Sequence, residues 1–171
     1  MKSKEKLLWK EIGTPIGKML AGADRKGICF LQFADHTEMK ADFSAILSDE
    51  QEGRSFLTLL EKELEEYFGG KRREFSVPLS VHGSDFQKKV WEKLGEIPYG
   101  TTKTYREQAE HIGNPNSVRA VASANARNVV NILIPCHRVI SSNGRLAGYN
   151  GGILRKQQLL DLEKKYKKSC F

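Results

Sequence analysis

A cysteine and a histidine stand side by side at the end of an apolar run in this chain. Residues 132–134, Ile-Leu-Ile, are followed by Pro-Cys-His-Arg-Val at residues 135–139. This arrangement can present one activated thiolate, the form of cysteine that acts as a nucleophile. A thiolate forms near neutral pH only with help from a base, a cation or a helix dipole. The fold therefore has to bring such a group to Cys136.

The excess of positive charge lies in the half of the chain that contains Cys136. The 171 residues carry a net charge of +7. Residues 1–80 hold 13 Lys and Arg against 14 Asp and Glu, whereas residues 81–171 hold 15 against 7, a net charge of +8. The second half either presents a basic face to solvent or forms a domain that binds a polyanion. Charge alone does not decide between these two interpretations.

Composition excludes several classes of protein. No run of ~18 apolar residues is present, so we expect no membrane span, and the charged start precedes too short an apolar stretch for a secretory signal. The cysteines Cys29, Cys136 and Cys170 are odd in number and form no CxxC pair. We therefore expect no disulfide framework, no metal site and a reducing intracellular setting. Cys29, in an apolar strand, is interpreted as a buried small hydrophobe.

The first half is typical of a small α/β domain. Its patterns predict strands at residues 7–9, 18–21 and 28–33, with turns at 14–17 and 24–27. Apolar residues at helical spacing predict a helix over residues 55–68 that ends at Gly69. The apolar residues of that helix are Phe56, Leu60, Leu64 and Tyr67. Because residues 75–79 read as an extended link, we place a scaffold domain at 1–80 and a second domain at 81–171.

The second half is predicted to be mostly helical. Ser84 can cap a helix whose apolar face holds Phe86, Val90 and Leu94, and residues 97–100 turn the chain out of it. Helices over residues 104–112 and 117–128, joined by residues 113–116, form a helix-turn-helix pattern. The fold class is therefore α+β: a small domain with a short antiparallel sheet, then a mostly helical domain of helix-turn-helix (winged-helix-like) type.

The helix at residues 117–128 is rich in small residues and carries its charge on Arg119 and Arg127. The small residues are Ala120, Ala122, Ser123, Ala124 and Ala126. Small side chains let a helix backbone approach another surface closely. Packing on a neighbouring helix and docking on a DNA groove both fit this segment alone, and within a basic domain we favour DNA.

The last predicted helix, residues 154–166, offers a carboxylate to the cysteine site. Glu163 lies four residues after Leu159 and three after Leu160, on the apolar side of the helix. A carboxylate that points inward needs a partner, and His137 is the natural candidate; the alternative is a surface position among the neighbouring lysines. Neighbours in an extended segment point to opposite sides, so His137 would reach Cys136 directly only if the chain turns there. Pro135 makes such a turn plausible, but a bridging water is the easier solution. We therefore expect Glu163 to hold His137, His137 to polarise a water, and that water to deprotonate Cys136.

From about residue 7 to residue 166 the sequence resembles the O6-alkylguanine-DNA alkyltransferases, which are DNA-repair proteins. Besides residues 135–139, the resemblance rests on motifs at family spacing: Phe86-Gln87, Val90-Trp91, residues 97–101, Tyr105, residues 113–115, residues 119–121, Asn128 and residues 148–152. It implies a methylated-DNA–protein-cysteine methyltransferase that flips O6-alkylguanine, mainly O6-methylguanine, out of double-stranded DNA. The alkyl group would pass irreversibly to Cys136 in a single turnover, without a cofactor.

The resemblance also implies how DNA is held. The helix-turn-helix would enter the minor groove, where Arg119 would fill the space of the flipped nucleotide; a simple phosphate contact is the alternative for Arg119. The same helix would contact DNA through Ser117, Ala120, Ser123 and Arg127.

Further roles around the base follow from the same resemblance. Tyr105 would hydrogen-bond a ring nitrogen of guanine, although a core aromatic is the alternative, and Asn128 would be the hinge before the active-site segment. The base pocket would comprise Val139, Tyr149, Asn150 and Gly151. Val129 and Asn131 stand where the family often has proline, and Asn150 where it often has a small residue. Tolerance for bulky alkyl groups therefore stays open.

Three other functions fit parts of the sequence. A non-catalytic lesion sensor would share the fold but lack the acceptor cysteine, which Cys136 argues against. A cysteine hydrolase needs oxyanion donors and leaves the basic half unexplained. A transcription regulator needs a dimer, and no heptad pattern is visible. We therefore expect a monomeric repair protein in the cytoplasm, or the nucleus of a eukaryote, with DNA as its partner and no membrane.

Overall fold

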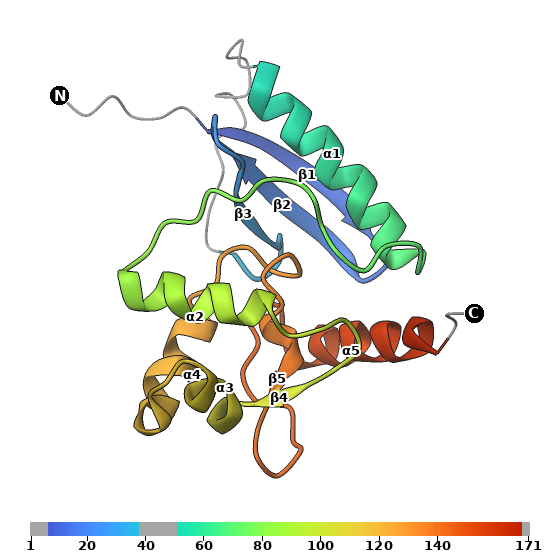
Figure 1. Ribbon diagram of the computed structural model, residues 1–171. Coiled ribbons are helices and arrows are strands. Elements are labelled where there is room, and N and C mark those ends of the chain that lie inside the picture. Colours follow the sequence, from blue (N-terminus) through green and yellow to red (C-terminus); the bar gives the residue numbers. More distant parts are fainter. Residues whose placement is uncertain (1–6, 38–50, 169–171) are drawn as a thin grey trace, which may run out of the picture. The chain divides into compact units, whose positions relative to one another are not determined.

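The chain folds into two compact units, residues 1–81 and 82–171. The computed structural model describes residues 7–37 and 51–168 (Figure 1). Cys170 lies outside these ranges. The α+β class predicted from the sequence is confirmed, with a small antiparallel sheet in the first unit and mostly helices in the second.

The first unit is a three-stranded antiparallel sheet with a helix packed against it (Figure 1). Its elements are β1 (Leu8–Thr14), β2 (Gly17–Ala23), β3 (Ile28–Phe33) and α1 (Gln51–Phe68). The first two strands are longer than predicted, because Lys10 and Glu11 interrupt the apolar pattern while still pairing with Ala21 and Leu20. Glu11 is exposed, whereas Lys10 on the other face of the strand is half-buried and pairs with Glu61 of α1.

Helix α1 buries Leu57, Leu60, Leu64 and Tyr67 against this sheet. Phe56, which the spacing assigned to the apolar face, is only half-buried, and Leu57 takes the core position. The helix begins at Gln51, four residues earlier than predicted, because its first turn has few apolar residues to reveal it.

The link after α1 returns to the hairpin between β2 and β3. The backbone N–H of Ile28 donates to Pro78 across 2.8 Å, and the hydroxyl of Ser80 donates to Asp24 across 2.5 Å. A side chain on Gly27 would place its Cβ 2.3 Å from the Pro78 carbonyl oxygen, so this close approach requires glycine. Cys29 is half-buried rather than buried, and its thiol donates to the Gly22 carbonyl across 3.4 Å.

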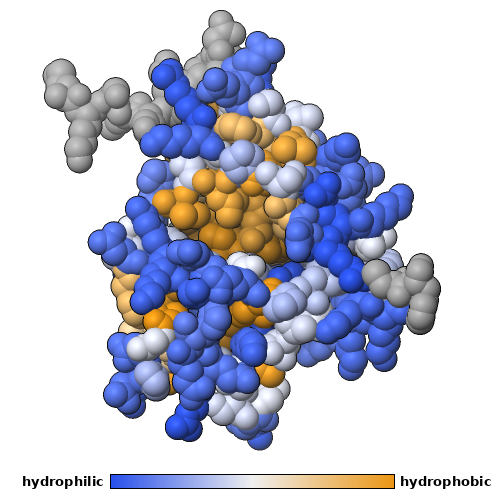
Figure 2. All heavy atoms as spheres, in the orientation of Figure 1, coloured by the Kyte–Doolittle hydropathy of each residue, from blue (hydrophilic) through white to orange (hydrophobic). Residues whose placement is uncertain are grey.

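The second unit consists of short helices around one small parallel strand pair. Its elements are α2 (Asp85–Gly95), β4 (Lys103–Thr104), α3 (Tyr105–His111), a 3₁₀ turn (Pro115–Ser117), α4 (Val118–Ala126), a 3₁₀ turn (Cys136–Arg138), β5 (Val139–Ile140) and α5 (Ile153–Lys167). Strand β4 pairs with β5 in parallel. The outer face of α5, which exposes Asp161, Lys164 and Lys165, is hydrophilic (Figure 2).

Two capping boxes fix where α2 and α3 begin. The hydroxyl of Ser84 accepts from the N–H of Gln87, whose side chain accepts in return from the N–H of Ser84. Thr104 and Glu107 form the same pair at the start of α3. Each box satisfies two backbone donors that a helix start leaves unpaired.

Helices α3 and α4 form the predicted helix-turn-helix. Gly113, with a φ of 85°, closes the turn between them. Gln108 of α3 and Asn125 of α4 exchange two buried hydrogen bonds of 3.0 and 2.7 Å. Helix α4 ends at Ala126 rather than at Asn128, because the Asn128 side chain bonds groups further along the chain.

Candidate active site and DNA-facing helix

The nucleophile candidate Cys136 begins a tight turn. Residues Cys136–Arg138 form a 3₁₀ turn in which the N–H of Arg138 donates to the Pro135 carbonyl across 3.0 Å. The sequence left both an extended segment and a turn at Pro135 open, and the structure has the turn, because Pro135 adopts ψ 60° and bends the chain. Cys136 is 6% exposed, and the turn directs His137 and Arg138 toward α5.

The backbone that leads into this turn is strained. Ile132 has a φ of 72°, an uncommon value for a β-branched residue that typically costs about 1–3 kcal/mol. Asn131 beside it is fully buried, and its side-chain nitrogen and oxygen have no hydrogen-bond partner among the described residues. The surrounding fold has to hold this bend in place.

Asn128 holds the turn together through its side chain. Its Nδ2 donates to the Ile134 carbonyl across 2.9 Å and to Sγ of Cys136 across 3.2 Å. Its Oδ1 accepts from the N–H of Val130 across 2.9 Å. Burial raises the pKa of the Cys136 thiol, whereas the Asn128 hydrogen bond and the charge of Lys156 favour the thiolate.

His137 and Glu163 form a buried pair, with Nε2 of His137 lying 2.8 Å from Oε1 of Glu163. Both side chains are 0% exposed. Burial disfavours ionised Glu163, but hydrogen bonds and charge from His137 and Arg138 outweigh it and hold the pKa of Glu163 well below its usual range. Burial also lowers the pKa of His137, against the effect of Glu163.

The charges of this pair fix the tautomer of the imidazole. An ionised carboxylate only accepts hydrogen bonds, so Nε2 of His137 carries the proton. Because the lowered pKa keeps His137 neutral near pH 7, its Nδ1 has a lone pair. This Nδ1 is buried and has no hydrogen-bond partner among the described residues. His137 is therefore ready to accept a proton at Nδ1.

The sequence reasoning missed Arg138 as the second partner of Glu163. Nε of Arg138 lies 3.0 Å from Oε2, and its NH2 nitrogen lies 2.9 Å from Oε1. A third nitrogen of the guanidinium, NH1, donates to the Ile97 carbonyl across 2.7 Å. Oε2 of Glu163 also accepts from the N–H of Gly100 across 3.0 Å. Glu163 therefore joins three segments of the unit.

Lys156 was also missed, although the signal that identified Glu163 would have found it. It lies seven residues before Glu163 and three before Leu159, on the same inner face of α5. It is 0% exposed. Its Nζ donates to the carbonyls of Val139, Ala147 and Gly148.

Cys136 lines a pocket of about 420 Å³. The lining residues are Tyr105, Ala122, Asn125, Ala126, Cys136, Ala147, Gly148, Tyr149 and Asn150. The Tyr105 hydroxyl donates to the Ala147 carbonyl across 2.8 Å, and the Tyr149 hydroxyl is buried with no hydrogen-bond partner among the described residues. Burial raises the pKa of both phenols, so both can donate near neutral pH.

Two of the expected pocket residues do not line this pocket. Val139 begins β5 and is 0% exposed, and Gly151 is buried just before α5. Tyr149 and Asn150 do line it, and Nδ2 of Asn150 donates to the Asn128 carbonyl across 3.4 Å. In the loop between β5 and α5, residues 147–150 therefore line the pocket, whereas Gly151 does not.

Helix α4 has two different faces, one buried and one exposed. Val121, Ala124 and Asn125 are buried, and the Ala124 carbonyl accepts from the Trp91 indole across 2.9 Å. The opposite face leaves Arg119, Ala120, Ser123 and Arg127 exposed, with Ser117 half-buried before it. One face thus packs on neighbouring helices, while the other is free to meet a ligand.

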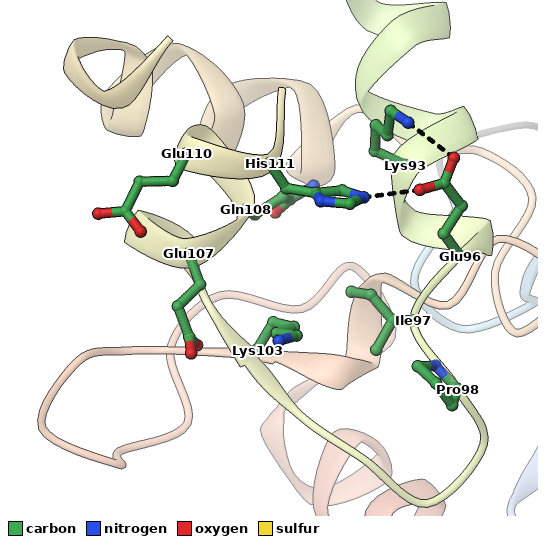
Figure 3. Close-up of a pocket in the computed structure, with 9 residues that line it drawn as sticks. All are labelled: Lys93, Glu96, Ile97, Pro98, Lys103, Glu107, Gln108, Glu110 and His111. Carbon is green, nitrogen blue, oxygen red and sulfur yellow. Dashed lines mark hydrogen bonds and ion pairs between the residues drawn. The ribbon is translucent and has the colours of Figure 1, made fainter. Parts of the chain in front are cut away.

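A second pocket, of about 430 Å³, lies between the end of α2 and α3 (Figure 3). Glu96 reaches between Lys93 and His111, at 2.8 and 2.6 Å, and the hydrogen bond from Lys93 lowers the pKa of Glu96. This pocket contains no nucleophile. Across the described parts of the chain, no cluster of three or more potential ligands for a metal ion is found.

Comparison with known proteins identifies the family. Residues 85–165 match the description "6-O-methylguanine DNA methyltransferase, DNA binding domain", and residues 7–81 match the ribonuclease-like domain of the same protein. The fold and site define a cysteine-dependent protein built on a helix-turn-helix unit. The chain belongs to the 6-O-methylguanine DNA methyltransferase family.

Individual relatives agree with this family. A methylated-DNA–protein-cysteine methyltransferase of Methanosarcina acetivorans is 44% identical over 151 residues, covering 88% of this chain and 94% of the relative. The crystal structure of the Mycobacterium tuberculosis O6-methylguanine methyltransferase superposes with a TM-score of 0.81 at 38% identity, covering 94% of both chains. A second structure of the mycobacterial protein, in complex with DNA, has a TM-score of 0.79 at 38% identity over 92% and 93%.

Within the parts of the chain that the structure describes, no helix has the length and apolar character needed to cross a membrane.

Proposed function

We propose that this protein repairs DNA by removing the alkyl group from O6-alkylguanine, mainly O6-methylguanine, and transferring it to its own Cys136. One observation carries the proposal: Sγ of Cys136 lines a pocket beside the free face of a helix-turn-helix, in a chain of this family. The relatives that carry the methyltransferase name support the reaction.

The transfer is a displacement at the alkyl carbon. The Cys136 thiolate attacks the carbon in line, a sulfur–carbon bond forms and the carbon–oxygen bond breaks. The electron pair of the broken bond stays with guanine, which takes up a proton and is restored. A thioether is not readily cleaved, so each molecule reacts once and needs no cofactor.

The buried polar groups supply the proton path. Glu163 keeps the proton of His137 on Nε2, which leaves Nδ1 as the base. Nδ1 polarises a water that takes the proton of Cys136. Asn128 donates to the sulfur and favours the charge that forms there.

Guanine reaches this pocket only after it leaves the duplex, because the reacting atom lies inside the base stack. The exposed face of α4 enters the minor groove, and Arg119 fills the space of the flipped nucleotide. Ser117, Ala120, Ser123 and Arg127 contact the backbone around it. Tyr105 turns its hydroxyl toward a ring nitrogen of the base, and Tyr149 and Asn150 form the pocket wall.

In this proposal the two domains have different functions. Residues 1–80 serve as a scaffold, and residues 81–171 bind DNA and accept the alkyl group. The protein acts as a monomer on double-stranded DNA, in the cytoplasm or, in a eukaryote, in the nucleus.

Intact mass spectrometry tests the proposal directly. The protein is mixed with a duplex that contains one O6-methylguanine, and the expected result is a single added methyl group that maps to Cys136. Cys29→Ser is the matched control, because Cys29 is the other cysteine in the described residues and its loss should change nothing. An unchanged mass with the lesion still bound would instead indicate a damage sensor, and no binding would reject the DNA assignment.

A further inference from the structure

Four lysines lie close together at the end of α5, outside the site described above. Lys164, Lys165, Lys167 and Lys168 are all exposed, and Tyr166 between them is half-buried. Residues 164–168 contain no acidic residue. These four residues, called the lysine cluster below, form a strongly positive surface that the proposed alkyl transfer does not use.

The stability of α5 explains only part of this charge. Positive side chains near the C-terminus of a helix interact favourably with the helix dipole. Lys167 has a further structural role, because its Nζ donates to the Gly100 carbonyl across 3.3 Å and its side chain lies over Gly100. Lys164 and Lys168, however, are four residues apart on one face of the helix, where like charges repel and destabilise it. A bound anion would relieve that repulsion.

The lysine cluster lies far from the pocket and from the helix-turn-helix. Helix α5 begins at Ile153, three residues after the pocket residue Asn150, and its 15 residues span about 22 Å. Figure 1 shows α4 and the last turn of α5 on opposite sides of the β4–β5 pair. Exposed charges are screened over about 8–10 Å at physiological salt. The lysine cluster therefore adds little to the binding of a duplex at α4.

The chemistry of the lysine cluster suits the phosphate backbone of DNA. Duplex DNA carries one negative charge per about 1.7 Å of its axis, and Lys164, Lys165 and Lys168 lie within about 6 Å along α5. Three exposed ammonium groups can therefore meet neighbouring phosphates at the same time. When one stretch of DNA is bound at α4, other stretches are present at high local concentration. This favours DNA over other polyanions as the partner.

We propose that the lysine cluster is a second DNA-binding surface, through which a molecule held on one duplex by α4 binds the phosphates of another DNA segment. This inference rests on the proposed contact of α4 with DNA. The second contact lets the protein pass between DNA segments without full dissociation while it searches for a damaged base. It is independent of sequence, because phosphate contacts carry no sequence information directly.

The experiment measures whether a bound protein captures a second duplex. A short duplex is tethered through biotin and saturated with protein, unbound protein is washed away, and a second duplex that carries a fluorophore is added. The wild type should capture it. The logarithm of the capture constant should fall with the logarithm of salt concentration with a slope of about −2.7, as expected for three lysine–phosphate contacts.

The triple variant Lys164→Gln, Lys165→Gln, Lys168→Gln should capture the second duplex at least about tenfold more weakly, with a salt slope near zero. Its affinity for the first duplex should stay within about twofold, because the changes lie beyond the screening distance. Single-turnover methyl transfer from a short duplex should not change, since none of the three lysines lines the pocket. Lys167 is kept because it contacts Gly100.

A matched control removes the same charge from the first unit. Its changes are at exposed lysines: Lys18→Gln, Lys26→Gln and Lys71→Gln. This control should capture the second duplex like the wild type, which separates a local surface from an effect of net charge. Far-UV circular dichroism checks that both variants are folded, and analytical ultracentrifugation should show one protein with two duplexes.

Several results would overturn the inference. They are a wild type that binds the first duplex but captures no second one, a folded triple variant that captures like the wild type, and a complex of two proteins with two duplexes. Loss of phosphatidylserine vesicle binding in the triple variant, without any capture of DNA by the wild type, would assign the lysine cluster to membranes instead. Failure of the wild type to bind even the first duplex rejects the proposed contact of α4, which is a different outcome.

Discussion

The side chain of Asn128 donates a hydrogen bond to Sγ of Cys136, eight residues further along the chain, across 3.2 Å. The same amide donates to the Ile134 carbonyl and accepts from Val130. One residue therefore closes the bend into the cysteine turn and contacts the nucleophile. The residue proposed as the hinge therefore also contacts the sulfur of the proposed nucleophile.

Asn128→Asp should impair both roles. The new carboxylate cannot donate to the sulfur or to Ile134, and its charge opposes a thiolate, so the pKa of Cys136 should rise and transfer should slow by about tenfold or more. The loss of stability should be about 2–4 kcal/mol, because a charge replaces a buried donor. Asn143→Asp is the control, since Asn143 is exposed and bonds only through its oxygen, to the N–H of Arg145. Equal rates for both variants would contradict a role for Asn128 at the sulfur.

Glu163→Gln should destabilise the protein strongly at pH 7. Removal of one member of a buried ion pair leaves Arg138 without its carboxylate, which typically costs about 3–5 kcal/mol. Urea unfolding measures this loss. Asp161→Asn on the exposed side of the same helix removes the same charge and should cost less than about 0.5 kcal/mol.

The acid dependence of stability should change in the same Glu163→Gln variant. Since the pKa of Glu163 is lower in the folded state, the unfolded chain takes up the proton first as pH falls. The stability that Glu163 contributes is complete above about pH 4.5 and is lost as pH falls further. Glutamine does not titrate, so the stability of the variant should fall less steeply between about pH 5 and pH 3. Parallel acid profiles for the two proteins would show that the ion pair is not the cause.

Arg119 and Arg127 should have separable effects, although both are exposed on the same helix. Arg127→Ala should weaken binding to all sequences and reduce the salt slope of binding by about 1, as expected for one phosphate contact. Arg119→Ala should slow transfer from duplex DNA by about tenfold or more, because it removes the group that offsets the cost of flipping. Filter binding at several salt concentrations and single-turnover rates separate the two effects. If both variants lose only salt-dependent affinity, Arg119 is a phosphate contact.

Cys136→Ala should abolish transfer and keep DNA binding. The substitution removes the nucleophile but leaves the exposed face of α4 unchanged. Binding to a duplex that contains O6-methylguanine should therefore stay within about threefold of the wild type, less than 1 kcal/mol. Loss of binding together with transfer would mean that the cysteine is structural.

Much of the fold follows from short-range patterns in the sequence. Ser84 and Gln87 encode the start of α2 because a capping box needs only residues three apart. The short apolar run of residues 28–33 predicts β3, and the spacing from Leu159 to Glu163 places the carboxylate inward. In each case the interaction that decides the structure lies within one turn or one strand, so local pattern is sufficient.

The departures at the site arise from contacts between distant segments. Arg138 shares Glu163 with His137 because the chain bends at Pro135 into a 3₁₀ turn, a conformation that the sequence left open beside an extended segment. Val139 and Gly151 were expected in the base pocket, but Val139 is buried where β5 pairs with β4, Gly151 is buried just before α5, and neither lines the pocket.

The sequence by itself determined the family, the two-part organisation of the fold, and the presence of one cysteine beside a histidine in a basic half. The tertiary structure alone decided which groups surround that cysteine. Burial turns the ionisable side chains His137, Arg138, Lys156 and Glu163 into one linked set, because charges removed from water have to pair with whatever group the packing brings close. Which buried groups pair depends on how segments far apart in the chain pack together, and local sequence patterns do not contain that information.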